Sequence, residues 1–95
     1  MRDTTPRISV IIPTLQEQNY IEATLSRLLK VKPSVEVIVV DGGSQDKTVE
    51  VAQGFTDKVY QISKRGIAAG RNYGARKANG DLLVFLDTCL LYTSD

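Results

Sequence analysis

Four short apolar runs, rich in Val, Ile and Leu, recur along the chain at residues 8–12, 35–40, 59–62 and 82–86. Runs of this length that are apolar at most positions are typical of strands buried on both faces of a sheet. The pattern therefore predicts four buried strands, separated by longer segments of mixed polarity.

The first intervening segment, residues 20–30, has the pattern of an amphipathic helix. Its apolar residues fall at i, i+4, i+7 and i+8 from Ile21, which places them along one helix face. Asn19 followed by Glu22 resembles a capping box, and this predicts that the helix begins there. Pro33 prevents the helix from continuing.

Two further helices are expected. Ser44 or Asp46 can cap a helix that ends near Gly54, and residues 68–78 form a third helical stretch containing two glycines. The predicted order is strand, helix, strand, helix, strand, helix, strand. Such alternation indicates an α/β fold with a doubly wound, mostly parallel sheet and right-handed crossovers.

Composition is that of an ordinary globular protein. The 95 residues are 42% hydrophobic and 24% charged, with a net charge of +1. This balance gives no sign of a nucleic-acid partner. Six cations nevertheless gather between residues 58 and 77, and a local anionic ligand such as a phosphate is therefore expected.

Residue usage excludes several kinds of site. The chain has no histidine and a single cysteine, Cys89, so His-based triads, ordinary zinc sites and an intrachain disulfide are all excluded. A reducing, cytoplasmic setting is expected. The longest apolar run is far shorter than the ~20 residues of a membrane helix, and no membrane segment is expected in this chain.

Ligands of parallel α/β sheets bind beyond the carboxyl ends of the strands. Asp41 stands at such a strand end, directly before a Gly-Gly-Ser turn. Its carboxylate can accept hydrogen bonds from a nucleotide base or a ribose. It can equally fix the turn or cap the next helix, as Asp often does. The residues alone leave both roles open.

Asp87 and Arg71 are the other charged candidates. Asp87 also ends a predicted strand, where a carboxylate can bind Mg²⁺ or Mn²⁺ or simply form a turn. Arg71 lies in a glycine-rich segment, where a guanidinium can reach a phosphate or lie on a solvated helix face. Neither a Walker loop nor a G-x-G-x-x-G fingerprint accompanies them.

Together, four segments resemble the ordered motifs of the family 2 glycosyltransferases with the GT-A fold. The segments read ISVIIPTLQE at residues 8–17, VIVVDGGSQDKT at 37–48, GRNYG at 70–74 and NGDLLVFLD at 79–87. The resemblance implies a truncated, Rossmann-like nucleotide-binding half. The full-length relative is expected to transfer a sugar from a UDP-type nucleoside-diphosphate donor to an acceptor hydroxyl.

The resemblance also implies roles for individual residues. Pro13 and Thr14 would line the base pocket through their backbone, and Arg71 would approach the phosphates. The full set expected to contact the nucleotide sugar is Pro13, Thr14, Glu17, Asp41, Gly43 and Arg71.

Metal binding is implied in the intact enzyme, with Asp87 as the first carboxylate of an Asp-x-Asp motif for Mg²⁺ or Mn²⁺. This chain departs from the motif because Cys89 stands where the second acidic residue is expected. A thiolate is a poor ligand for a hard cation, and this weakens the predicted metal site. Milder departures are Gln16 in place of a frequent Asn and Gly42 in place of a frequent Asp.

Residues 88–95 are expected to be a non-native tail on a partial domain that is family-like over residues 8–87. Residues 89–95 resemble the conceptual translation of a transposon-end sequencing adapter. The catalytic base is expected beyond Asp95, so residues 1–95 alone are expected to be inactive. The alternatives are a non-catalytic nucleotide-binding or interaction module, and a small dinucleotide-binding or phospho-acceptor domain.

Overall fold

The computed structural model describes residues 7–32, 34–63 and 67–86. Strands and helices alternate in the predicted order, which confirms the α/β class. The elements are β1 (Ile8–Thr14), α1 (Gln18–Val31), β2 (Glu36–Asp41), α2 (Thr48–Gln53), β3 (Val59–Gln61), α3 (Ile67–Lys77) and β4 (Leu82–Phe85).

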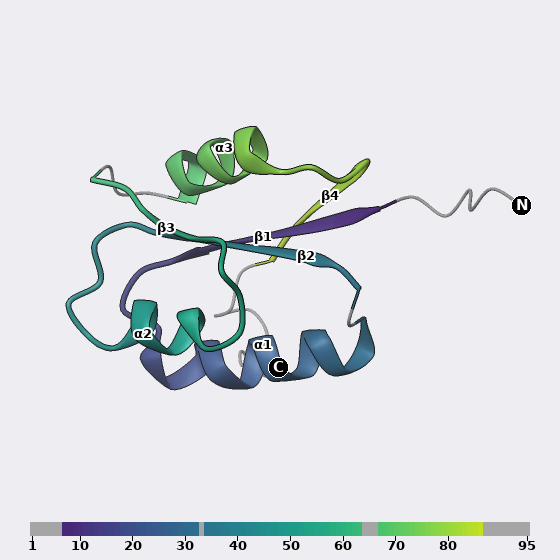
Figure 1. The fold of residues 1–95 in the computed structure, drawn as a ribbon. Helices are drawn as coiled ribbons and strands as arrows, with labels where there is room; N and C mark the ends of the chain where they lie inside the picture. The colour runs from purple at the N-terminus through teal and green to yellow at the C-terminus, as the bar shows by residue number, and fades with distance from the viewer. Residues whose placement is uncertain (1–6, 33, 64–66, 87–95) are drawn as a thin grey trace, which may run out of the picture.

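The four strands form one parallel sheet in the order β3-β2-β1-β4. Helices α1 and α2 cover one face and α3 covers the other (Figure 1), so the sheet is doubly wound as predicted. The chain steps outward from β1 to β3, and α3 then returns it to β4 on the other side of β1. The strand order therefore reverses between β1 and β4, the kind of switch point at which ligands bind in open α/β sheets.

Alternating side chains of the strands supply two separate cores. The face under α1 and α2 buries Val10, Ile12, Ile21, Leu25, Val37, Val39 and Ala52. The face under α3 buries Ile11, Ile38 and Val40. Because β1 and β2 are apolar on both faces, they form the centre of the sheet.

Helix α3 lies unusually close to β1, through its two glycines. A Cβ atom built on Gly70 would lie 2.8 Å from Cβ of Pro13, and one built on Gly74 would lie 2.4 Å from Cγ2 of Ile11. These separations are shorter than carbon–carbon contact distances. The two glycines are therefore required for this close approach of α3 to β1.

The predicted helix starts were wrong in detail. Helix α1 begins at Gln18, so Asn19 lies inside the helix and forms no capping box with Glu22. Helix α2 begins at Thr48 with Lys47 at its N-cap position, so neither Ser44 nor Asp46 is the N-cap residue. The Asp46 carboxylate nevertheless accepts from the backbone N–H of Thr48 at 3.0 Å.

Strand β4 is the exposed edge of the sheet on the β1 side. Four consecutive apolar side chains are between 39% and 51% exposed, namely Leu82, Leu83, Val84 and Phe85. Among the described residues, the helices leave at least one face of β4 uncovered. The continuous apolar run, which predicted a fully buried strand, is therefore a half-exposed edge in this chain. Within the described ranges, no helix has the length and hydrophobicity to cross a membrane.

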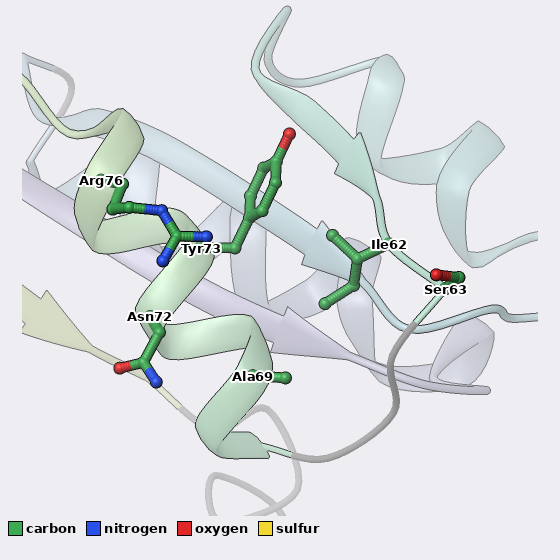
Figure 2. Close-up of a pocket in the computed structure, with 6 residues that line it drawn as sticks. All are labelled: Ile62, Ser63, Ala69, Asn72, Tyr73 and Arg76. Atoms are coloured by element: carbon green, nitrogen blue, oxygen red, sulfur yellow. The ribbon is translucent and has the colours of Figure 1, made fainter.

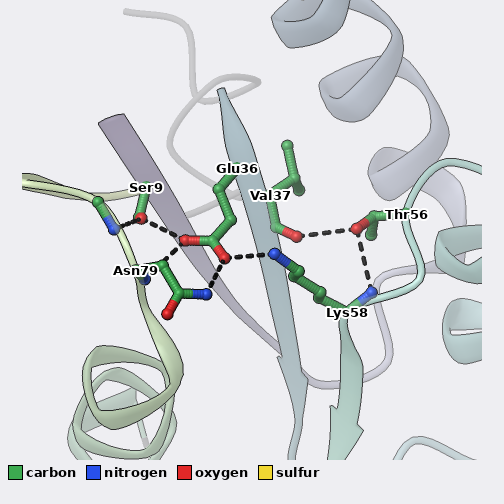
Figure 3. A network of polar contacts seen from close by, with 7 residues as sticks. Ser9, Glu36, Val37, Thr56, Lys58 and Asn79 are labelled. Atoms are coloured by element: carbon green, nitrogen blue, oxygen red, sulfur yellow. Dashed lines mark hydrogen bonds and ion pairs between the residues drawn. The ribbon is translucent and has the colours of Figure 1, made fainter. Parts of the chain in front are cut away.

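A polar network joins the strands at their amino ends (Figure 3). The carboxylate of Glu36 accepts hydrogen bonds from the Ser9 hydroxyl at 2.5 Å and from the Asn79 backbone N–H at 2.8 Å, and it forms an ion pair with Lys58. Ser9 Oγ in turn accepts from the N–H of Gly80 at 2.8 Å. The network connects β1, β2 and β3 with the segment that leads into β4.

This environment lowers the pKa of Glu36. Burial opposes ionisation and would raise the pKa, but the hydrogen bonds from Lys58, Ser9 and Asn79 outweigh it and lower the pKa to about 2, from an ordinary value of 4.5. The folded state thus holds this proton more weakly than the unfolded chain. The stabilisation is complete above about pH 4.5 and is lost as the pH falls toward about 2.

Glu36→Gln is expected to reduce the loss of folding stability that accompanies a fall in pH. The amide cannot ionise, so its contribution stays constant between about pH 6 and about pH 3, whereas the parent chain loses stability over that interval. Urea denaturation at the two pH values measures the difference. Glu22→Gln, at an exposed position of α1, is the control and should retain the parent pH dependence. Parallel pH profiles for the parent and Glu36→Gln would contradict the prediction.

Candidate functional site

The Asp41 carboxylate is fully buried at the end of β2 and is held by its own turn. One oxygen, Oδ1, accepts from the hydroxyls of Thr14 at 2.8 Å and Ser44 at 2.5 Å. The other, Oδ2, accepts from the backbone N–H groups of Gly43 at 3.0 Å and Ser44 at 2.7 Å. Gly43 has a φ of 108°, a conformation that favours glycine.

Four hydrogen bonds from the chain occupy both oxygens of Asp41. Of the two roles that the sequence left open, this geometry favours the turn-fixing role. A direct contact between Asp41 and a base stays a prediction. Thr14 lies beside Asp41 in the parallel register of β1 and β2, so these two expected site residues form one buried pair, next to the exposed Gly43.

The loop after β1 and the loop after β2 are clasped together by hydrogen bonds between residues 16–18 and 44–48, here called the loop clasp. The N–H of Gln16 donates to Ser44 Oγ at 2.8 Å, and the N–H of Glu17 donates to Thr48 Oγ1 at 2.9 Å. In return, Gln16 Oε1 accepts from the N–H of Gln45. The loops after β1 and β2 are therefore held in fixed positions relative to each other.

The loop clasp also caps the two helices reciprocally. The N–H of Gln18, in the first turn of α1, donates to Asp46 Oδ2 at 3.2 Å, while Gln18 Oε1 accepts from the N–H of Lys47 at 3.0 Å. Asp46 also accepts from the hydroxyl and N–H of Thr48. The Thr48 hydroxyl is the main cause of a lowered pKa for Asp46. Each helix start is thus satisfied by the neighbouring loop, because residues 28 or 29 positions apart supply the caps.

Gln16 adopts a left-handed conformation, with a φ of 56°. Asn tolerates this region better than Gln does, so the replacement noted in the sequence carries some backbone strain. The longer Gln side chain reaches Gln45 across the loop clasp, and this contact offsets the strain. Glu17 follows directly, at the N-cap position of α1.

Arg71 lies on the opposite side of the sheet from Asp41, at the switch point between β1 and β4. Its guanidinium carbon lies 5.6 Å from the ring centroid of Phe85 on β4, within the range of a cation–π interaction. Neighbouring Gly70 packs on Pro13 of β1. Pro13 and Arg71 therefore both belong to the α3 side, where Gly70 packs on Pro13 and Arg71 lies over Phe85, whereas Thr14, Asp41 and Gly43 meet at the turn.

Asp87, the expected metal ligand, lies outside the described residues, as does Cys89. Within the described ranges, no three acidic or cysteine side chains gather in a way that could hold a metal ion. The described edge thus carries the loop clasp and, on its α3 side, the exposed guanidinium of Arg71. The sequence did not indicate that Gln18, Asp46 and Thr48 join the two loops. Polar residues in the loops that follow two neighbouring strands are a sequence signal for such contacts.

Comparison with known proteins places the chain in a family. The model of the family described as glycosyl transferase family 2 matches residues 9–93. An uncharacterized glycosyltransferase of Haemophilus influenzae is 36% identical over 90 residues, a match covering 87% of this chain and 36% of that protein.

Solved structures agree with the sequence match. A mannosyltransferase, PcManGT from Pyrobaculum calidifontis in complex with GDP-Man and Mn²⁺, has a TM-score of 0.79 and 29% identity over 87% of this chain and 27% of its own. S. aureus TarS 1-349 in complex with UDP has a TM-score of 0.77 and 32% identity over 86% of this chain and 27% of its own. This chain thus spans about a third or less of these relatives. The fold is the GT-A nucleotide-binding half, and the chain belongs to the family 2 glycosyltransferases.

Proposed function

We propose that this chain binds the nucleotide part of a UDP-type nucleoside-diphosphate sugar along the carboxyl edge of β1, β2 and β4. In the longer protein, this edge would present the sugar for transfer to an acceptor hydroxyl. The observation that carries the proposal is the loop clasp, which fixes the two loops that follow β1 and β2 beside the switch point. A preorganised edge of this kind lowers the entropic cost of holding a flexible ligand.

The proposal assigns different tasks to the two sides of the edge. On the turn side, Asp41 positions the backbone of Thr14 and Gly43 so that the base can lie against them, and Glu17 lies near the nucleoside. On the α3 side, Pro13 forms a floor and Arg71 reaches the diphosphate. A guanidinium suits this task because it donates two parallel hydrogen bonds to phosphate oxygens. The same charge would stabilise the departing nucleoside diphosphate.

The available metal ligands do not fit a hard divalent cation. PcManGT was solved with Mn²⁺, but in this sequence Asp87 is followed by Thr88 and Cys89. A single carboxylate beside a thiol is a poor donor set for Mg²⁺ or Mn²⁺, which bind oxygen ligands. The function proposed for this chain therefore includes no metal-dependent step. We place the domain in the cytoplasm, where a lone cysteine stays reduced.

Arg71→Gln is expected to weaken UDP binding by roughly 10- to 100-fold, because a hydrogen bond to a charged group contributes about 1.5–3 kcal/mol. Isothermal titration calorimetry of the 95-residue chain with UDP measures the change. Lys30→Gln, which removes an exposed cation from the end of α1, is the matched control and should bind as the parent does.

A parallel titration with GDP tests the type of nucleotide, since relatives have been solved with both UDP and GDP-Man. We expect UDP to bind more tightly. If the parent chain is folded by circular dichroism and yet binds neither nucleotide, the proposed function is wrong.

A further inference from the structure

A groove lies between α3 and the residues that follow β3 (Figure 2). It adjoins the carboxyl edge of the sheet, because the N–H of Ile62 donates to the backbone carbonyl of Asp41 at 2.8 Å. Its lining residues are Ile62, Ser63, Ala69, Asn72, Tyr73 and Arg76. Four of them stand at i, i+3, i+4 and i+7 along α3 and so share one helix face. Figure 2 shows Ala69 directed toward Ser63 across the groove, and the Tyr73 ring extending beside Ile62 with its hydroxyl pointing away from Ser63.

The groove faces away from Arg71. Successive side chains on a helix are rotated by about 100°, so Arg71 lies on the other side of α3 from the face formed by Ala69, Asn72 and Arg76. The cation–ring contacts agree with this geometry. Arg71 lies over Phe85 of β4, whereas Arg76 lies over Tyr73 and Lys77 lies over Tyr60 of β3. Helix α3 therefore separates the groove from the proposed phosphate contact.

Hydrogen-bond donors surround an apolar floor in this groove. Ser63, Asn72 and Arg76 each carry donor groups, and within the described parts of the chain their side chains have no hydrogen-bond partner. The floor consists of Ile62 and Ala69. Residues 58–80 contain no Asp or Glu, so the donors have no acidic neighbour in this segment. An anionic ligand group would satisfy them.

One wall of the groove is aromatic. The Tyr73 ring lies 5.6 Å from the Tyr60 ring at an interplanar angle of 55°. The Arg76 guanidinium carbon lies 5.7 Å from the Tyr73 centroid, and Lys77 Nζ lies 5.4 Å from that of Tyr60. These cations lie over the rings, with Lys77 Nζ also 5.5 Å from the Tyr73 centroid, so positive charge is held directly beside both tyrosines. A flat, apolar ligand body can pack on Tyr73 while its anion meets Arg76.

The size of the groove selects a small ligand. Its volume is about 230 Å³, below the roughly 300–1,000 Å³ of pockets that enclose drug-sized ligands. A nucleoside-diphosphate sugar is too large for it. From charge, shape and size together, we propose that this groove is a second anion site, specific for a small aryl phosphate monoester and independent of the nucleotide edge.

Phenyl phosphate is the probe that tests this site on the full 95-residue chain. In ¹H–¹⁵N correlation spectra we expect saturable shifts of Ser63, Ala69 and Asn72, with and without saturating UDP. Arg76→Gln should weaken phenyl phosphate binding at least about tenfold, since a charged hydrogen bond is lost. Arg76 is exposed, so the variant should fold, as circular dichroism can verify.

Matched controls separate this site from the nucleotide edge. Arg71→Gln and Lys30→Gln should leave phenyl phosphate binding unchanged, and Arg76→Gln should leave UDP binding unchanged. Tyr73→Leu should remove the preference for phenyl phosphate over inorganic phosphate. Competition between UDP and phenyl phosphate would overturn the second site, as would full phenyl phosphate affinity in Arg76→Gln. Failure of UDP to bind, with these results otherwise intact, would refute only the proposed function.

Discussion

Gly74→Val should lower the free energy of unfolding by about 3 kcal/mol, the largest effect expected of any single change considered for this chain. The new Cβ would lie 2.4 Å from Cγ2 and 3.1 Å from Cγ1 of Ile11, whose side chain is fully buried in the centre of the sheet. Relief would require α3 to move away from β1 and open the core under α3. Overpacking of this kind costs about 3 kcal/mol or more, a large part of the roughly 5–15 kcal/mol that stabilises a typical domain.

Far-UV circular dichroism and urea denaturation measure this effect. Gly74→Ala should also destabilise the chain, although Ala is the better helix former by about 1 kcal/mol, because even a methyl group meets Ile11. Ala68→Val, at an exposed position of the same helix, is the control for β-branching and should cost well under 1 kcal/mol, roughly the propensity difference. A Gly74→Val chain as stable as Ala68→Val would show that α3 does not pack as described.

Asp41→Ala is expected to have the second largest effect. It leaves the hydroxyls of Thr14 and Ser44 and two backbone N–H groups without their acceptor. Each buried polar group left unsatisfied costs about 1–3 kcal/mol, so the free energy of unfolding should fall by roughly 3 kcal/mol or more. UDP affinity should fall with it, because the turn that positions Gly43 is lost.

The Asp41→Asn variant separates the two roles of this residue. Its amide keeps one acceptor but turns an NH₂ group toward donors, so a turn-fixing Asp41 predicts a marked loss of stability in urea denaturation. A base contact alone predicts weaker UDP binding with an unchanged unfolding curve. Asp57→Asn, at an exposed aspartate, is the control and should alter neither measurement. Unchanged stability in both Asp41 variants would rule out the turn-fixing role.

The element order and sheet type could be predicted from the sequence because each depends on local patterns. Apolar runs flanked by turn residues predicted all four strands, and the stripe beginning at Ile21 predicted α1. The helix starts could not be predicted in this way. Gln18 and Lys47 receive their capping partners from a loop distant in sequence, so a search for nearby caps selected Asn19 instead.

The sequence predicted which loops lie at the carboxyl edge of the sheet, whereas the ligand contacts of the residues there stay a prediction. Strand ends identified Pro13, Asp41 and the turn after it, since parallel strands bring their carboxyl ends to one edge. Whether the Asp41 carboxylate faces a ligand or its own turn depends on which face of the sheet it occupies and on Thr14 of the neighbouring strand. Such contacts arise only once β1 and β2 are paired. The groove beside α3 likewise depends on how Tyr73 and Arg76 lie against Tyr60.

The pairing of β1 with β4 has a consequence for how the chain folds during synthesis. Arg7 and Ser9 bond to Asp81 and Gly80, across 71 to 74 residues, whereas β1, α1, β2, α2 and β3 are successive neighbours. The first five elements can therefore assemble while the rest is still in the ribosome. Until α3 emerges, the face carrying Ile11, Ile38 and Val40 stays open to water and to other nascent chains. Chaperone dependence should therefore be concentrated in the interval before residue 77 is released, and closing the sheet over such a long sequence separation should set the folding rate.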